Sequence, residues 1–231
     1  MANKTFRLEN GQLIKIYKRR QTKNIRLAIT TSGQARVTIP VWAPYSIGLD
    51  FARKRQDWIK KHQFKKDLIY NGQLIGKCHH IYFEVSDKPR LTYSLNQNSI
   101  VIKYPFTLTI EDALVQAKAN AVAIKALKNQ AESLLTIRIN ELSKMHQITF
   151  EKLNIKQLKS RWGSCDSNKN ITLNLYLMQL PWHLIDYVIT HELVHTKVLR
   201  HGPLFWQEIS KYDENYKNHK KELQSYNTFV A

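Results

Sequence analysis

The segment from Thr109 to His146 contains neither glycine nor proline and is rich in alanine, leucine, lysine and glutamate. These residues favour the α-helix, and apolar residues recur at the three-and-four spacing of a helix with a buried face. Thr109 followed by Glu111 and Asp112 suits a helix start, because the first turn attracts negative charge. We therefore expect one long helix from about Thr109 to His146.

The sequence changes character near residue 105. Before it, apolar and polar residues alternate in short runs, and the dipeptides Asn10–Gly11 and Ser32–Gly33 predict hairpin turns. After it, helical patterns dominate. We expect an α+β fold in two parts, a β-rich basic N-terminal region of residues 1–105 and a catalytic part of residues 106–231.

The positive charge is unevenly distributed. The chain carries 36 lysines and arginines against 18 acids, a net charge of +18. Residues 1–66 hold 16 of these basic residues and three acids, a net charge of +13. A positive field attracts nucleic acid or an acidic protein. A lysine-rich solvated surface explains the charge equally well, because no recognition motif accompanies it.

Neither membrane nor secretory features are evident. No apolar run approaches the ~18 residues that a membrane span needs, and the N-terminal segment lacks the apolar stretch and cleavage site of a secretory signal. The two cysteines, Cys78 and Cys165, cannot form a disulfide scaffold, so a reducing compartment fits. We expect a soluble protein of the cytoplasm.

The motif His191-Glu192-Leu193-Val194-His195 lies in a helix expected to begin near Pro181. Histidines four residues apart are about 40° apart around a helix and about 6 Å apart along it, so both rings can reach one ion. Glu192 points about 100° away, towards a water molecule beside the metal. Zinc suits this chemistry, because imidazole is a good ligand and three protein ligands leave room for water. The alternative is a buried helix face with histidines at its margin.

A third ligand has to come from beyond this helix. His201 lies ten residues after His191, and an uninterrupted helix would carry it about 15 Å along the axis. A bend before Gly202 and Pro203 would fold it back towards the ion. This spacing favours His201, and the alternatives are Glu208, His219 and Glu214.

Three segments together resemble the YgjP-like metallopeptidase domain family, relatives of SprT-like and WLM zincins. They are KSRWGSC at Lys159–Cys165, LNLYLMQLPWHLIDYVITHELVH at Leu173–His195 and HGPLFW at His201–Trp206. The resemblance implies a zincin-like fold, one zinc ion per chain on His191, His195 and His201, and Glu192 as general base or acid. It also implies a metallopeptidase that acts on peptides or proteins.

Several further residues are candidates for substrate binding. Arg161 is available to hold a substrate carboxylate or an oxyanion, although a helix-capping arginine is equally plausible, and Trp162 and Gly163 suit a core anchor and a tight turn. Asn174 lies in an alternating stretch that would hold an extended peptide by strand addition. Candidate stabilisers of a tetrahedral intermediate are Tyr176, His183 and Tyr212. No second cysteine lies close to Cys165 in the sequence, so we expect Cys165 to be a small buried residue. A second metal site at Cys78-His79-His80 is disfavoured, because adjacent residues of a strand face opposite sides.

The combined prediction is a zinc-dependent metallopeptidase of the HExxH type that hydrolyses peptide bonds with a metal-activated water and Glu192 as general base. Two alternatives stay open. The first is a nucleic-acid-associated protein that docks through residues 1–66, and the second is a zinc hydrolase of another amide or an ester, which needs the same metal, water and base.

Overall fold

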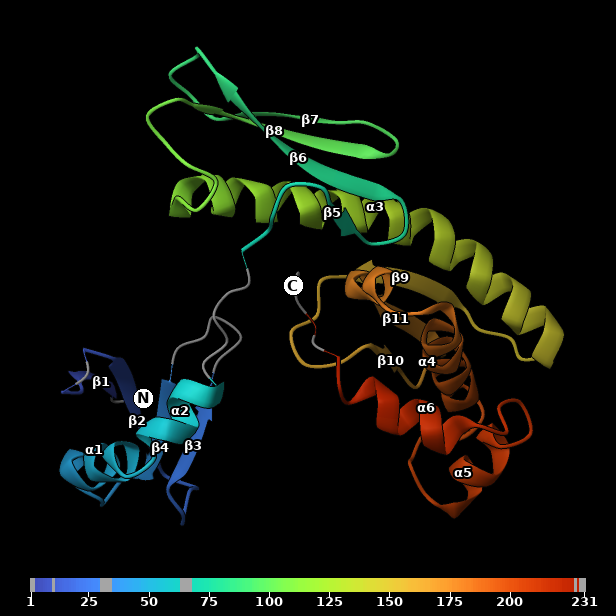
Figure 1. Ribbon diagram of the computed structural model, residues 1–231. Helices are drawn as coiled ribbons and strands as arrows, with labels where there is room; N and C mark the ends of the chain where they lie inside the picture. Colours follow the sequence, from blue (N-terminus) through green and yellow to red (C-terminus); the bar gives the residue numbers. More distant parts are fainter. Residues whose placement is uncertain (1–2, 10, 30–34, 63–67, 227, 229–231) are drawn as a thin grey trace. The chain divides into compact units, whose positions relative to one another are not determined.

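The computed structural model describes residues 3–9, 11–29, 35–62, 68–226 and 228. The chain divides into two compact units, Met1–Leu68 and Ile69–Val230 (Figure 1). The described residues form three small sheets and six α-helices, which confirms the predicted α+β class. The division differs from the predicted boundary near residue 105, because the strands of residues 73–105 pack on the long helix and belong to the second unit.

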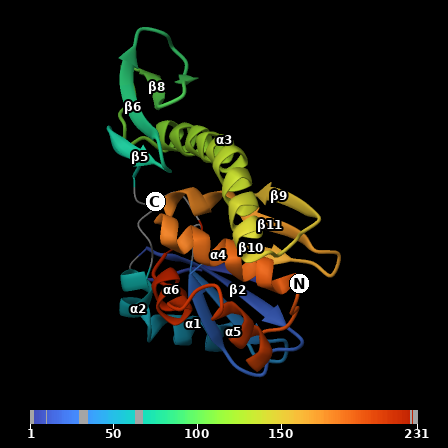
Figure 2. The ribbon, with the colours of Figure 1, turned by 90° about the vertical axis from the view of Figure 1, so that its right-hand side faces the viewer.

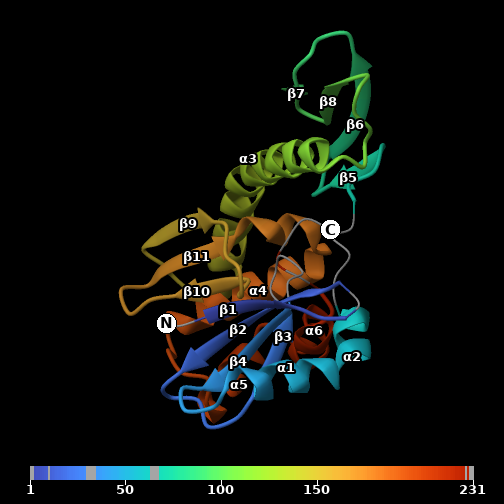
Figure 3. The ribbon, with the colours of Figure 1, turned by 90° about the vertical axis from the view of Figure 1, so that its left-hand side faces the viewer.

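The first unit is a four-stranded sheet with two helices. Its strand order is β1-β2-β4-β3, in which β2 and β4 are parallel and the outer strands antiparallel (Figure 3). β1 and β2 are antiparallel neighbours, as are β3 and β4. Of the turns predicted between them, Asn10 and residues 30–34, which include Ser32–Gly33, lie outside the described part of the chain. The elements are β1 (Asn3–Arg7), β2 (Leu13–Arg19), β3 (Arg26–Ile29), β4 (Ala35–Pro40), α1 (Tyr45–Arg53) and α2 (Gln56–His62).

This unit has its own apolar core. Alternate residues of β2 and β4 are fully buried under α1 and α2, as the period of a strand with one covered face requires. Gly48 brings α1 close to the sheet, since a Cβ atom there would lie 3.0 Å from Ile39 Cγ2 and 3.1 Å from Ile16 Cγ2. α1 is thereby packed closely against β2 and β4 in one small domain.

The second unit is organised around α3. Figures 1 and 2 show the sheet β5-β6-β8-β7 beside the first half of this helix, and the sheet β10-β11-β9 with α4 beside its second half. The elements are β5 (Gln73–Ile75), β6 (His79–Ser86), β7 (Thr92–Leu95), β8 (Ser99–Pro105), α3 (Ala113–His146), β9 (Lys152–Lys156), β10 (Gly163–Cys165), β11 (Asn170–Asn174), the 3₁₀ helix η1 (Leu175–Gln179), α4 (Trp182–His195), α5 (Pro203–Ile209) and α6 (Tyr216–Leu223).

The long helix is the predicted one with a later start. It has 34 residues, about 51 Å of helix, and begins at Ala113 rather than Thr109. The reason is local, because the Asp112 carboxylate accepts hydrogen bonds from the backbone N–H and the hydroxyl of Thr109 and holds this segment in a turn. The helix ends at His146, as predicted, where Gln147 adopts a left-handed conformation with φ of 53°.

Two buried glutamines fasten the β-sheet segment to α3. Gln116 exchanges two hydrogen bonds with the backbone of Ile69, and Gln130 bonds to the backbone of Ile75 and Lys77. A buried amide that is fully hydrogen-bonded fixes the register of the chain it binds. Residues 69–77 are therefore tied to the helix, which places the sheet in this unit.

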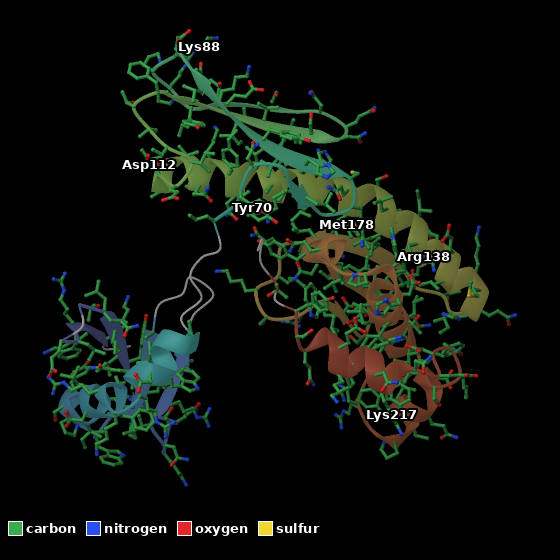
Figure 4. The ribbon with its side chains drawn as sticks, viewed as in Figure 1. Tyr70, Lys88, Asp112, Arg138, Met178 and Lys217 are labelled. Atoms are coloured by element: carbon green, nitrogen blue, oxygen red, sulfur yellow. The ribbon has the colours of Figure 1, made fainter. Side chains whose placement is uncertain are left out.

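At its other end, α3 is joined to α4 by an ion pair. Figure 4 labels Arg138 on α3. This residue donates two hydrogen bonds to Asp186, of 2.6 Å from Nε and 2.7 Å from Nη2. Such a forked arginine–carboxylate pair is stronger than a single contact. It fixes α4 against the long helix, and α4 carries the sequence motif with two histidines. Among the described helices, none has both the length and the apolarity to cross a membrane.

Candidate metal centre

α4 is held rigidly because most of its surface is covered. Its buried side chains include Leu184, Ile185, Val188, Ile189, Leu193 and Val194, and the helix packs against β10, α3, α5 and α6. Pro181 precedes the helix at the N-cap position, close to its predicted place. A helix fixed on several sides keeps the side chains at its C-terminal end in one arrangement. His191, Glu192 and His195 all lie in its last turn and a half.

The chain turns sharply after α4, as the distance to His201 requires. The helix ends at His195, and Thr196 and Val198 donate backbone hydrogen bonds to Leu193 and Val194 in a final turn. The segment then reverses, and α5 begins at Pro203. The predicted bend before Gly202 is present, and because the helix already ends at His195, His201 can come back towards the other two histidines.

The three histidines converge through their Nε2 atoms. The distances are 3.2 Å between His191 and His195, 2.9 Å between His191 and His201, and 3.0 Å between His195 and His201. Each residue offers one ligand atom to a common point, so the group could hold a metal ion. Three imidazole nitrogens facing one point are a donor set typical of zinc enzymes.

The protonation of the rings suits metal binding. Burial, with the neighbouring histidines acting in the same direction, lowers the pKa of His191 to about 3, and burial also lowers the pKa of His195. Both rings are therefore neutral at neutral pH. His195 Nδ1 lies 3.1 Å from the carbonyl oxygen of Val198. A carbonyl only accepts, so Nδ1 carries the proton and Nε2 presents a lone pair to the common point.

Glu192 is buried beside the histidines. Only 5% of the residue is exposed, and its Oε2 atom has no hydrogen-bond partner within the described chain. Burial raises the pKa of Glu192 to about 8, against the opposing influence of the Arg161 charge. A buried carboxyl oxygen without a partner is costly, so it indicates a group that interacts with a ligand.

Gly163 makes room for this carboxylate. A Cβ atom at that position would lie 2.6 Å from Glu192 Oε1 and 2.7 Å from its Cγ. Gly163 lies in β10 rather than in the tight turn that the sequence suggested, and the need for glycine comes from close approach. The RWGSC segment therefore forms one wall beside Glu192.

The sequence matches a known protein family over most of its length. The sequence model described as "YgjP-like, metallopeptidase domain" matches residues 23–226, most of the chain. The chain belongs to the YgjP-like metallopeptidase domain family. The resemblance drawn from the three sequence segments is confirmed.

Solved structures and curated proteins add less. The metallopeptidase zymogen jannalysin of Methanocaldococcus jannaschii has 26% identity and a TM-score of 0.34, and the match covers 38% of this chain and 90% of jannalysin. The metallopeptidase zymogen abylysin of Pyrococcus abyssi has 22% identity and a TM-score of 0.35, with 38% and 89% covered. The search of curated proteins gives no match.

The predicted substrate-binding residues of this YgjP-like chain differ in exposure. Arg161 is exposed at the surface, and its charge is felt by Glu192. Asn174 is fully buried, and its amide bonds to the backbone of Leu158, Arg161 and Tyr176. The Tyr176 hydroxyl, also in a buried residue, accepts a hydrogen bond of 2.7 Å from Gln157. Asn174 and Tyr176 thus hold the loop of residues 157–161 in place.

The strand expected to receive a peptide is also different. Asn174 ends β11, which is the central strand of its sheet and pairs with β10 on one side and β9 on the other. Both edges of β11 are occupied, so the expectation of strand addition there is wrong. The edge strand nearest to Glu192 is β10.

The alternative third ligands lie outside the histidine group. The Glu208 carboxylate is taken by Lys197, Lys211 and Tyr212, which lower its pKa to about 2. His219 pairs with Asp213 at 2.8 Å. Among the residues that the structure describes, the metal-competent group comprises His191, His195 and His201 and none of Glu208, His219 and Glu214.

Sequence reasoning missed the aromatic wall behind the histidines. Phe205 is fully buried, and its ring centroid lies 4.4–4.8 Å from those of all three histidine rings. Trp206 stacks between His201 and Tyr216 at 5.7 Å from each. The HGPLFW segment could have indicated this packing. Pro203 begins a helix there, and the helix brings Phe205 and Trp206 against the histidine rings.

The remaining candidates have other partners. Tyr212 contacts Glu208 and Lys197, and His183 contacts Glu222 at 3.0 Å. Burial raises the pKa of the Cys165 thiol to about 11, so it is a poor nucleophile. His79 is buried between Gln130 and the carbonyl of Asn96, as expected of a structural histidine.

Proposed function

We propose that this YgjP-like protein is a zinc-dependent metallopeptidase that hydrolyses peptide bonds, with Glu192 as general base. One observation carries the proposal, the convergence of three histidine nitrogens within 3.2 Å of one another beside a buried carboxylate whose Oε2 has no partner among the described residues. A purely structural zinc site needs no base next to it, so Glu192 favours catalysis.

His191, His195 and His201 would hold one zinc ion per chain. A zinc ion in a three-histidine site acts as a Lewis acid, which polarises a carbonyl and makes water more acidic. The residues themselves fit this group, because His195 presents a lone pair from Nε2 and the pKa of His191 lies well below neutral pH. The Phe205 ring behind them excludes water and fixes their orientation.

Glu192 would move the proton. Its carboxylate takes a proton from the attacking water as the new carbon–oxygen bond forms, and returns it to the leaving nitrogen as the carbon–nitrogen bond breaks. Gly163 supports this role, because the absence of a side chain lets β10 pass the carboxylate without displacing it. The metal's positive charge would favour the ionised carboxylate that this step needs.

The substrate would lie along β10. This strand pairs with β11 alone among the described strands, so its other edge is available to an extended peptide. Arg161, exposed just before β10, would hold a substrate carboxylate or the oxyanion. Asn174 and Tyr176 would act indirectly, by fixing the loop that carries Arg161.

The test is the substitution Glu192→Gln, which keeps the shape of the side chain and removes the base. Zinc content, measured by elemental analysis, should stay at about one ion per chain. Hydrolysis of an unfolded protein should fall by at least ~100-fold. Undiminished hydrolysis in this variant would reject the proposed mechanism.

A parallel assay addresses the alternative of another zinc hydrolase. The wild-type protein is given an unfolded protein, a simple amide and a simple ester under the same conditions. Turnover of the amide or the ester with none of the protein would replace the peptidase assignment while keeping the metal, the water and Glu192.

A further inference from the structure

The first unit contains a basic pocket far along the chain from the metal centre. A hollow of about 860 Å³ is lined by Lys18, Arg19, Arg20, Gln21, Thr22, Arg26 and Val41. Its four cations come from the end of β2, the turn after it and the first residue of β3. The register explains why they meet, since Arg19 and Arg26 lie opposite Pro40 and Thr38 of β4, which stands between the two strands.

Among the described residues, none that lines the pocket is acidic. Of the three acids in residues 1–66, Glu9 and Asp50 are contacted by Arg53 on α1, and Asp57 lies in α2. Within the described chain, no carboxylate forms an ion pair with Arg19, Arg20 or Arg26. Clustered cations repel one another, so their presence at one end of a sheet destabilises the unit unless an anion binds there.

One of the four cations is fixed in place. Lys18 Nζ donates a 3.1 Å hydrogen bond to the carbonyl of Val41 and lies 4.9 Å from the centroid of the Tyr45 ring. This contact joins the end of β2 to the turn after β4. Arg19, Arg20 and Arg26 stay exposed around it, with guanidinium groups that match phosphate oxygens in pairs.

An exposed aromatic residue directly follows this pocket. Trp42 is 77% exposed, and it comes next in the chain after Val41, which lines the hollow and is itself 46% exposed. Proteins bind unpaired bases by combining aromatic rings, on which the bases stack, with cations that attract the phosphate backbone, and Trp42 lies one residue along the chain from Val41 of the hollow.

We propose that the pocket of Lys18, Arg19, Arg20 and Arg26, together with Trp42, binds single-stranded nucleic acid. The arginines contact successive phosphates and Trp42 stacks on a base. An acidic polypeptide would satisfy the arginines but has no flat base for Trp42, and a duplex keeps its bases inside the helix. The site is independent of the metallopeptidase assignment, because no residue of the metal centre contributes to it.

The test measures binding of fluorescein-labelled oligothymidylate and oligouridylate of about 12 nucleotides to the full chain. Fluorescence anisotropy is recorded between about 50 and about 200 mM salt. The pocket variant is R19E/R20E/R26E, at three exposed positions. The matched control is K144E/K152E/K156E, which makes the same change of net charge on exposed residues of the second unit. Thermal unfolding verifies that both variants fold.

The pocket variant should lose at least tenfold in affinity at low salt, and its log–log salt slope should fall by about 2, since each phosphate contact contributes about 0.7 for single strands. The control should retain most of the affinity. Trp42→Ala should weaken binding by about tenfold, which corresponds to one lost stacking contact, and Trp42→Phe should recover part of it. Hydrolysis of the unfolded protein should be the same in all of these variants.

Four results would overturn the proposal. Equal losses in the pocket variant and the control would mean diffuse charge rather than a site. An unchanged affinity in Trp42→Ala would exclude stacking of a base on this ring. Duplex bound as tightly as single strands would also exclude recognition of unpaired bases. Polyglutamate bound more tightly than either oligonucleotide would make an acidic protein the partner of this pocket.

Discussion

The two units differ in what brings their candidate functional residues together. In the second unit, His191, Glu192 and His195 lie within five residues, and one helix fixes their geometry. In the first unit, Lys18, Arg19 and Arg20 are consecutive, and Arg26 joins them because β2 and β3 both pair with β4. Bond-making chemistry needs a fixed arrangement, whereas electrostatic attraction tolerates many. A motif therefore marks the first kind of site, and an excess of charge marks the second.

The largest expected effect tests the metal centre. His201→Ala should abolish zinc binding, because two histidines on one helix do not complete a three-ligand site. Glu208→Ala is the matched control, since its carboxylate is engaged by Lys197, Lys211 and Tyr212. Elemental analysis of both purified variants should find zinc in the control alone. The opposite pattern would show that the third ligand has been misassigned.

A pair of glycine substitutions compares the two units directly. Gly163→Ala places a Cβ atom 2.6 Å from Glu192 Oε1, so the carboxylate has to move and hydrolysis should fall by about 100-fold. Gly48→Ala crowds Ile39 at 3.0 Å in the first unit, but it also gains about 1 kcal/mol of helix propensity. It should leave the hydrolysis rate unchanged. A similar loss of activity in both variants would mean that the units are coupled.

The ion pair between α3 and α4 should matter more for stability than a surface pair. Arg138→Met removes two hydrogen bonds from the half-buried Asp186 and should lower the free energy of unfolding by about 1–3 kcal/mol. Lys128→Met, which removes a 3.6 Å pair with Glu132 on the same helix, should lower it by at most about 0.5 kcal/mol. Chemical denaturation measures both losses. Equal losses of free energy of unfolding in the two variants would mean that the Arg138–Asp186 pair stabilises the fold no more than a surface pair.

The smallest expected effect depends on pH. The folded-state pKa of Glu208, about 2, lies below its ordinary value of about 4.3. The ionised Glu208 carboxylate therefore contributes fully to the free energy of unfolding above the ordinary pKa, and this contribution is lost as the pH falls towards 2. With screening of the exposed lysines, Glu208→Gln should lower the free energy of unfolding by about 1 kcal/mol at pH 7. The difference from wild type should shrink between about pH 4 and about pH 2. A constant difference in denaturation across this range would exclude a charge effect.

Much of the second unit could be predicted from local patterns. The long helix was predicted to its last residue, His146, because its composition and the absence of glycine and proline act within the segment itself. The helix starts four residues later than predicted, because the Asp112 carboxylate accepts a hydrogen bond from the backbone N–H of Thr109 and holds it in a turn. The break after His195 followed from the geometry of a helix, which would otherwise carry His201 away.

The sequence by itself determined the histidine group and Glu192, since an i, i+4 pair on a helix and a nearby helix stop fix those positions through short-range geometry. Only the tertiary structure decided that β10 passes Glu192 at Gly163, that Asn174 is a buried anchor and that Phe205 lies against all three histidine rings. It also decided that β5, β6, β7 and β8 belong with α3. These arrangements depend on which surfaces pack together over long sequence separations, and a strand's own residues do not specify its neighbours.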